Sequence, residues 1–526
     1  MPVQTTDVFL INRGGVSYQV TAADIASLVQ DTDLMLVNRN GTSYKLTGAN
    51  FKASSFQDTD LFLVNRAGLS YQESGANVRS LIAVQRIWGW DAASDTYTTV
   101  PVADLNIDVQ SRMRRCLVSD AGVVEMYLDA NNSARRSGDW LRIVETATLD
   151  TPYTGTFGTA ETPNTLLRAG VPAWAAGTHR RGDRRFRNGS VWECVAANTT
   201  ATPAAGTITA TLNGTSQVMV EIPRFSVRHQ TSPSGAFNRH SFSIALGTVT
   251  TDGYEVHPAF VRLDGSMRDF IYVGAYLGTG TNGNGSLSGV NNTVSISRDA
   301  ARTACAGRGT GWHAYGFWTH NAIQWLYLTE YGDMISRRAL GLGSRPTATV
   351  SIKTTVATGA SNSRGNRCGN VTSTPPVDTD YMSYRGLENI TGCRSAMHRD
   401  GMNVDNSDPA GLRVYLCAHP ENFLSGTATN HTDFGLLPQS TTTAQIRDIG
   451  SGIALLPSAV DATTTPEQFV GDNLVTNATG TGWSGATVRT QNNTTSSLLV
   501  GIFGTNATID STISYNNVGT RLCYSP

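Results

Sequence analysis

Five side chains near the C-terminus have the chemistry of a binding surface rather than of a catalytic centre. They lie in loops rich in hydroxyl and amide groups, and they are Trp483, Arg489, Tyr515, Asn516 and Asn517. Aromatic rings and amides supply large contact areas at a low cost in conformational entropy, and binding loops are enriched in them. The pattern predicts ligand recognition on these loops. The alternative for Trp483 is a place in the core.

A second candidate surface lies between residues 172 and 203, where two tryptophans flank a run of arginines. Trp174 and Trp192 could stack on sugar rings, or both could form the small core of an inserted domain. The arginines could bind an anionic polysaccharide through bidentate contacts or form a solvated face. They are Arg180, Arg181, Arg184, Arg185 and Arg187.

No sequence motif indicates an enzyme. The chain lacks GxSxG, HExxH and Walker motifs, and its nine histidines follow no metal-ligand spacing. Carboxylates that could cleave a glycoside would have to be brought together by the fold. The candidates are Asp264, Asp269, Glu330 and Glu388. We therefore expect no catalytic residue, no metal and no cofactor.

The composition is typical of a β-rich and loop-rich protein with several domains. Of 526 residues only 15% are charged, and the net charge is −1, so we expect no nucleic-acid partner. We also expect neither membrane insertion nor Sec export, because no long apolar segment or signal-peptide pattern is present. Seven dispersed cysteines favour buried free thiols over disulfides. Lysine occurs only three times among the 40 basic residues, which we attribute to genome composition.

The elements that must position these surfaces are clearest between residues 297 and 331. Ser297 is a typical helix N-cap, and the aromatic stretch 311–317 suits a short buried strand. Thr319 is predicted to cap a second helix that buries one face and ends at Gly332.

Three repeats precede this region. A similar 15-residue unit begins at Thr6, Thr32 and Thr59. Each unit predicts a β-hairpin with a two-residue turn, followed by a short helix-like tail such as 22–28. One hairpin cannot bury its own face. We therefore expect the three to stack in series or to pack across a homotrimer.

Several of these segments resemble known families. The repeat unit is similar to repeats at the start of virion proteins from cyanophages and other marine phages. The helix, Gly-Trp-His and second helix between 297 and 331 resemble the C-type-lectin-like fold of phage adhesins. An ordered set of blocks, including YRGLENITG (384–392) and DGMNV (400–404), resembles a phage minor structural protein family. Residues 172–203 are similar to small chitin-binding-type carbohydrate modules.

The sequence block at 384–392 can be interpreted in two ways. Arg385, Glu388 and Asn389 could form a ligand cluster, or they could form a buried salt-bridge and capping network that organises long loops. We favour the second interpretation.

These observations predict a mostly β fold with a few helices (α+β) in four parts. Residues 1–82 would hold the hairpin repeats for virion attachment or oligomerisation, and 83–144 the first part of a lectin-like body. Residues 145–208 would hold a linker and the inserted module, and 209–526 the main lectin-like domain.

The resemblance implies a non-enzymatic virion protein of a tailed phage, assembled in the host cytoplasm. We expect a homotrimeric tail fibre or receptor-binding protein that binds other virion proteins through its repeats and a host surface glycan through its loops. The alternative is a head fibre, capsid decoration or tail-assembly protein without receptor contact. A weaker alternative is a polysaccharide-degrading tailspike.

Overall fold

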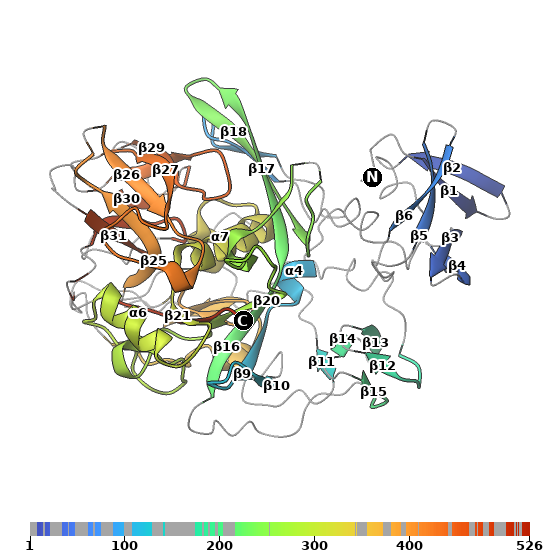
Figure 1. Cartoon of the computed structure of the whole chain (residues 1–526), viewed down its shortest axis with the longest axis horizontal. Coiled ribbons are helices and arrows are strands. Elements are labelled where there is room, and N and C mark those ends of the chain that lie inside the picture. The colour runs from blue at the N-terminus through green and yellow to red at the C-terminus, as the bar shows by residue number, and fades with distance from the viewer. Residues whose placement is uncertain are drawn as a thin grey trace.

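We describe the fold from a computed structural model, and it is mostly β with few helices, as predicted (Figure 1). The structure describes residues 8–13, 16–21, 34–39, 42–47, 61–66, 69–74, 88–98, 108–128, 140–142, 174–180, 183–187, 190–194, 198–202, 216–251, 253–341, 343, 355–371, 380–390, 396–408, 410–439, 444–461, 469–470, 472–476, 483–488, 501–509, 512, 514 and 518–526.

The three repeats form hairpins that share one sheet. Their strands are β1 (Val8–Arg13), β2 (Val16–Thr21), β3 (Leu34–Arg39), β4 (Thr42–Thr47), β5 (Leu61–Arg66) and β6 (Leu69–Ser74). Each pair is joined across two residues, which confirms the predicted hairpins. The tail predicted at 22–28 lies outside the described residues.

The first strands of the three hairpins also pair with one another in a cycle. In each contact, the asparagine near the end of one first strand faces the opening residue of another. The pairs are Asn12 with Leu34, Asn38 with Leu61, and Asn65 with Val8. The three repeats therefore form a closed arrangement with approximate threefold symmetry within one chain.

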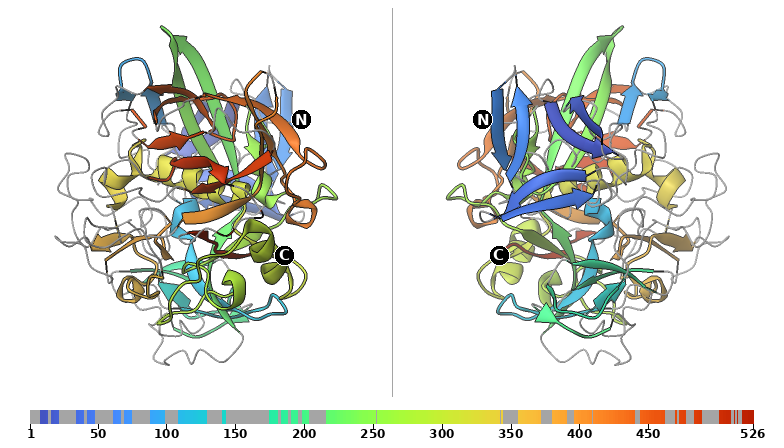
Figure 2. Two further views of the ribbon diagram at one scale, coloured as in Figure 1. Left: turned by 90° about the vertical axis from the view of Figure 1, so that its left-hand side faces the viewer. Right: turned by 90° about the vertical axis from the view of Figure 1, so that its right-hand side faces the viewer.

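The body contains four further sheets. One has the order β10-β9-β16-β20-β34-β21, and another has the order β19-β17-β18-β7-β8. Their strands are β7 (Trp88–Asp91), β8 (Thr96–Thr98), β9 (Arg114–Val118), β10 (Val124–Tyr127), β16 (Gln217–Pro223), β17 (Phe225–Ser234), β18 (Phe237–Leu246), β19 (Glu255–Val256), β20 (Phe270–Gly274), β21 (Trp312–Ala314) and β34 (Leu522–Tyr524). Figure 2 shows the β17–β18 hairpin extending beyond neighbouring elements in both views.

The third and fourth sheets come from the C-terminal part. A nine-stranded sheet has the order β27-β26-β25-β31-β32-β30-β28-β29, with β33 beside β25, and a small sheet has the order β22-β23-β24. Their strands are β22 (Gly369–Val371), β23 (Tyr381–Tyr384), β24 (Leu387–Glu388), β25 (Ala396–Asp405), β26 (Leu412–Leu416), β27 (Thr432–Leu437), β28 (Ala444–Ile449), β29 (Pro457–Asp461), β30 (Asn473–Val475), β31 (Trp483–Val488), β32 (Thr505–Ile509) and β33 (Val518–Gly519).

The described helices are α4 (Asp108–Ser111), α6 (Arg298–Ala306), α7 (Phe317–Tyr331) and α8 (Ser336–Leu340). Ser297 caps α6 as predicted, because its hydroxyl accepts the Ala300 N–H at 3.2 Å. The cap predicted at Thr319 is wrong: α7 begins at Phe317 with Gly316 as its N-cap. The helix does end at Gly332, whose φ of 64° is left-handed.

Helix α7 is buried on every side rather than on the single face predicted, because it packs against both β18 and β25. Its polar side chains bind loop carbonyl groups. Trp325 donates to the Ile453 oxygen at 2.9 Å, and Gln324 donates to the Ile502 oxygen at 2.9 Å. Buried loops need such donors for their backbone oxygens, so α7 holds the loops at Ile453 and Ile502 in place.

The inserted module has two small sheets. Its strands are β11 (Trp140–Arg142), β12 (His179–Arg180), β13 (Arg184–Arg187), β14 (Ser190–Cys194) and β15 (Asn198–Thr199). Strand β11 pairs with β14, so Trp140 belongs to the module and the boundary predicted at 145 comes too late.

The six described cysteines are buried free thiols, which confirms that prediction for those residues. Within the described ranges, no helix has the length and apolar character needed to span a membrane.

Candidate ligand-binding surface

The outer face of the nine-stranded sheet carries a row of aromatic and charged side chains. Along β26, Leu412, Val414 and Leu416 are buried, whereas Arg413 and Tyr415 are partly exposed. This alternation follows from the two-residue period of a strand. One face of β26 therefore packs into the core, and the other faces outward.

Strand pairing places further residues beside Arg413 and Tyr415. Asp405 on β25 pairs with Arg413 on one side and with Trp483 of β31 on the other. The rings of Tyr415 and Trp483 lie 5.5 Å apart and are tilted by 47°. Four partly exposed side chains thus share one patch, which we call the Trp483 surface: Asp405, Arg413, Tyr415 and Trp483.

A loop formed by residues 423–431 borders this surface. Asn403 holds it from below, because its amide group donates to the Leu424 and Thr427 oxygens, each at 2.8 Å. A Cβ atom added at Gly426 would lie 3.7 Å from Trp483. The loop therefore passes directly beside the Trp483 ring.

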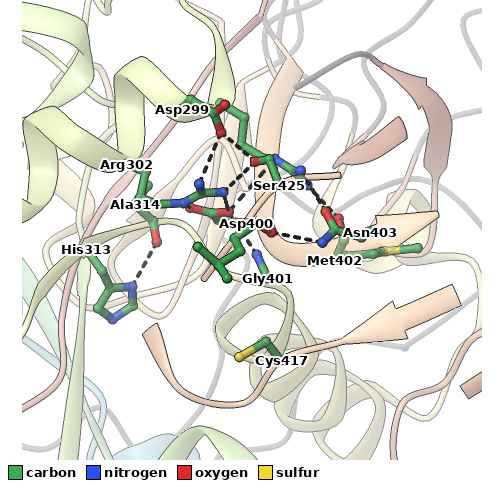
Figure 3. A network of polar contacts seen from close by, with 12 residues as sticks. Asp299, Arg302, His313, Ala314, Asp400, Gly401, Met402, Asn403, Cys417 and Ser425 are labelled. Carbon is green, nitrogen blue, oxygen red and sulfur yellow. Dashed lines mark hydrogen bonds and ion pairs between the residues drawn. The ribbon is translucent and has the colours of Figure 1, made fainter. Parts of the chain in front are cut away.

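A buried network anchors the same loop to α6 (Figure 3). The Arg302 guanidinium donates to both oxygens of Asp400, at 2.8 and 2.5 Å, and to the Ser425 hydroxyl at 2.9 Å. Arg298 donates to the Asn403 side-chain oxygen at 2.7 Å. Burial alone would raise the pKa of Asp400, but the hydrogen bonds from Arg302 and the two nearby guanidinium groups lower it. Buried ion pairs and hydrogen bonds thus hold the 423–431 loop in a fixed position.

Charges on the Trp483 surface are also fixed. Arg413 donates to Asp408 and, at 2.8 Å, to Asp433. The hydrogen bond from Arg413 lowers the pKa of Asp408, and the two carboxylates raise the pKa of Arg413. Burial lowers the pKa of His431, and its Nδ1 lies 2.7 Å from the Thr429 carbonyl oxygen. An aromatic pair beside oriented polar groups can bind a sugar ring by stacking and hydrogen bonding.

Of the five predicted loop residues, Trp483 is the one that lies in the described part of the chain. Trp483 pairs with Asp405, at the C-terminal end of β25. At the other end of β25, Met397 pairs with Val488 and Ala396 with Val518. Trp483 and Val488, which pair with these two ends, are five residues apart on β31, about 17 Å along the strand. Arg489, Tyr515, Asn516 and Asn517 lie outside the described residues.

The tryptophans of the inserted module form its core, the alternative weighed from the sequence. Trp192 is only 6% exposed and packs against Trp140 and Cys194. Its indole N–H donates to the Arg187 oxygen at 3.2 Å. Trp174 packs on the edge of this cluster, and the Arg187 guanidinium covers its ring at 4.8 Å. Trp192 is therefore buried, whereas Trp174 is partly exposed.

The arginine cluster of the module serves mainly internal contacts. Arg184 donates to Glu193 at 3.1 Å, and Glu193 also accepts from Arg114 of β9 at 2.6 Å. Burial would raise the pKa of Glu193, but the guanidinium of Arg114, with those of its neighbours, holds it well below its usual value. This buried pair ties the module to the body. Arg185 pairs with Asp183 at 3.6 Å, and the side chains of Arg180 and Arg181 lie outside the described residues.

Arg385, Glu388 and Asn389 form a buried structural network, which is the interpretation favoured from the sequence. The buried Arg385 pairs with Glu330. Glu388 accepts the N–H groups of Gly359 and Ser361, at 3.0 and 2.7 Å. The Asn389 side-chain oxygen accepts the Met382 N–H at 3.0 Å.

The remaining carboxylate candidates lie on a surface turn. Asp264 accepts the Ser266 N–H at 2.9 Å, and Asp269 pairs with Arg224 at 3.2 Å. Glu330 pairs with Arg385 and Glu388 accepts backbone N–H groups, so each of the four carboxylates has a partner of its own. Among the described residues, no group of three or more histidine, cysteine or acidic side chains is placed to hold a metal ion.

Sequence reasoning missed Asp405, Arg413 and Tyr415. The only local signal was the alternation in the sequence Leu-Arg-Val-Tyr-Leu at 412–416. A comparison of the chain with protein-family models and with curated proteins found no match to either.

Proposed function

We propose that the protein is a structural component of a tailed-phage virion, a tail fibre or receptor-binding protein, that recognises a host surface glycan through the Trp483 surface. The observation that carries this proposal is the Tyr415–Trp483 ring pair, partly exposed and flanked by Asp405 and Arg413. It combines a stacking platform with fixed hydrogen-bonding groups on a rigid sheet.

Two other features support the proposal. The three hairpins of residues 8–74 complete one another within one chain and would serve as a compact attachment unit. The succession α6, β21 and α7, with the last strand β34 paired to β21, is consistent with the C-type-lectin-like assignment. The homotrimer stays a prediction, to be checked by analytical ultracentrifugation.

Truncation of the ring pair tests the function. We expect Tyr415→Ala and Trp483→Ala to weaken binding of the labelled full-length protein to host cells by roughly 30-fold, because aromatic hot spots contribute about 2 kcal/mol or more. The purified protein should also compete with virion adsorption, and the variants should not. Leu263→Ala, at a position 57% exposed elsewhere on the body, is the control and should bind normally. Normal binding by both aromatic variants, with unchanged thermal unfolding, would remove the proposal.

One observation favours an assembly role as the second candidate. Strand β27 lies at the edge of the nine-stranded sheet, and on it Phe434 and Leu436 are 39% and 46% exposed. An apolar edge strand can pair with a strand of another protein. The protein would then be a head fibre, decoration or tail-assembly protein.

The two roles separate in one experiment. If assembly is the function, Leu436→Glu should reduce incorporation into virions at least tenfold, as measured by immunoblotting of purified particles, while Tyr415→Ala has no effect on adsorption. If receptor binding is the function, the reverse result is expected. The tailspike alternative receives no support from the described carboxylates.

A further inference from the structure

Two imidazole rings connect the projecting β17–β18 hairpin to the C-terminal sheet. Nε2 of His229 lies 2.9 Å from Nδ1 of His240. These two nitrogens belong to a row of three hydrogen bonds. At one end of the row, Nδ1 of His229 lies 2.7 Å from the Gly452 carbonyl oxygen. At the other end, Nε2 of His240 lies 2.7 Å from a carboxylate oxygen of Asp448. The two rings thus bridge two groups that can only accept hydrogen bonds.

Proton counting shows that this row of three hydrogen bonds needs one proton more than two neutral imidazole rings provide. Each of the three contacts between a donor and an acceptor atom, called gaps here, requires one hydrogen. A neutral imidazole carries a single N–H. Two neutral rings would leave one gap with two acceptors facing each other. All three gaps are satisfied only when a third proton is present.

His240 is the group best placed to hold the third proton. Asp448 already accepts the Ile449 N–H at 2.8 Å and two N–H groups of Asn238 at 3.2 and 3.1 Å. Together with Nε2 of His240, these donors place two nitrogen atoms against each oxygen of the Asp448 carboxylate. The His240 ring also stacks on Trp90, with centroids 5.3 Å apart, and an aromatic face attracts a cation.

His229 is then the neutral partner, with its hydrogen on Nδ1 and its Nε2 as the acceptor for His240. Burial lowers the pKa of His229 to about 4. Its ring lies parallel to Phe242, with centroids 4.7 Å apart, and edge-on to Trp325 of α7. This apolar setting opposes a second positive charge beside the first.

The other charged groups on the packed elements have partners of their own. On β7, Asp91 pairs with Arg239 of β18 at 2.7 Å. Asp95, in the β7–β8 turn, accepts the Trp90 indole N–H at 3.1 Å. Arg447 of β28 lies over the ring of Phe237 and donates to the Ala93 oxygen at 3.2 Å.

We propose that Asp448, His240, His229 and Gly452 form a proton-loaded latch that holds the hairpin against the turn after β28, and that loss of one proton opens it at Gly452. Opening falls at this end because Gly452 is exposed, whereas His240 and Asp448 are each only 2% exposed. Breaking a hydrogen bond in contact with water costs less than breaking one in the interior.

The sign of the pH dependence follows from the proton count. The latch is closed while three protons are present, and it is lost as pH rises and the third proton leaves. Its lower limit is near pH 4, where His229 also becomes charged and the two rings would direct N–H groups at each other.

Nitrogen-15 NMR of the full-length protein with labelled histidine tests the proton count directly. The His240 signals are assigned by their disappearance in His240→Gln. At pH 6 we expect both ring nitrogens of His240 to be protonated and only Nδ1 of His229 to be protonated. A His240 ring with a single proton at that pH would overturn the proposal.

Hydrogen exchange then tests the opening. The Gly450 N–H, which donates to the Leu456 oxygen at 2.8 Å, reports on the turn. After correction for intrinsic exchange, protection across residues 450–456 should fall at least tenfold between pH 6 and pH 8.5.

Two variants separate the latch from general pH effects. In Asp448→Asn the new amide can donate to His240, so two ring protons satisfy all three gaps and the pH dependence should disappear. Asp91→Asn removes a nearby carboxylate that takes no part in the three hydrogen bonds, and it should keep the wild-type pH dependence. Equal pH dependence in both variants would sink the proposal. If Asp448→Asn does not fold, the NMR result on the wild-type protein decides.

Discussion

Replacement of Asp400 by alanine is expected to lower the free energy of unfolding by about 3–5 kcal/mol, the usual cost of removing one partner from a buried ion pair. Asp400 is fully buried and accepts two hydrogen bonds from Arg302. Its loss removes the carboxylate 3.9 Å from the buried Arg298 guanidinium and leaves Arg302 with the more exposed carboxylate of Asp299, 3.1 Å away. Denaturant unfolding of the full-length protein, followed by tryptophan fluorescence, measures the change.

The chain offers a matched control in Asp408. It also pairs with an arginine, but that pair lies at the surface, so Asp408→Ala should lower the free energy of unfolding much less than Asp400→Ala does. Asp400→Asn keeps the shape of the side chain and removes only its charge, so its effect should fall between the two. Similar losses for Asp400→Ala and Asp408→Ala would contradict the stabilising role of the network. The same substitution should loosen the 423–431 loop, because Arg302 also holds Ser425.

The parts of the fold that depend on local sequence were predictable. Ser297 and Gly332 mark helix ends through hydrogen bonding and backbone conformation within one turn. The hairpins likewise follow from a two-residue turn between alternating strands. The Thr319 cap failed because the packing of α7 between two sheets, rather than a side-chain cap, sets where that helix begins.

The Trp483 surface depends on contacts that are distant in sequence. Trp483 was a candidate from the sequence, with a place in the core as its alternative. Its neighbour Tyr415 comes from a strand 68 positions earlier and meets it only because β25 lies between β26 and β31. No local pattern specifies that strand order. Buried and exposed tryptophans also look alike in sequence, which is why Trp174 and Trp192 remained ambiguous until their contacts were known.

The scarcity of lysine has a structural use beyond genome composition. Arg521, fully buried, donates to the carbonyl oxygens of Gly274 and Glu388, at 2.7 and 2.5 Å. Arg115 similarly reaches the Gly386 oxygen at 2.8 Å and the Ser361 hydroxyl at 2.9 Å. A planar guanidinium presents several donors in a fixed fork and is less strongly hydrated than an ammonium group. Arginine therefore suits a protein in which long buried loops expose many carbonyl groups.

The second large effect is acid instability. We expect the free energy of unfolding to fall by about 3 kcal/mol for each pH unit between pH 6 and pH 4. Burial lowers the pKa of His257 to about 3 and those of His313 and His398 to about 4, and it lowers the pKa of His320 further still. Because the unfolded chain binds these protons near pH 6.5 and the folded protein does not, stability is present above that pH and is lost below it.

Two buried carboxyl groups oppose this trend. Burial raises the pKa of Asp333 to about 6 and that of Asp472 to about 7, the latter against the Arg337 guanidinium 3.2 Å away. A carboxyl with a raised pKa binds a proton in the folded protein first, so each adds stability as pH falls through that value. These four histidines, with His229 as a fifth whose pKa burial lowers to about 4, against two carboxyls leave a net uptake of about two to three protons on unfolding, and each is worth about 1.4 kcal/mol per pH unit.

Denaturant unfolding at half-unit pH steps measures this slope. His257→Gln should reduce it by about 1.4 kcal/mol per pH unit, because glutamine does not titrate. His431, a partly exposed histidine, provides the control, and His431→Gln should change the slope much less. A loss of about 5 kcal/mol equals the whole stability of many domains, so the protein should unfold cooperatively near pH 4.5. An unfolding midpoint that stays constant from pH 7 to pH 4.5 would show that the buried histidines do not control stability.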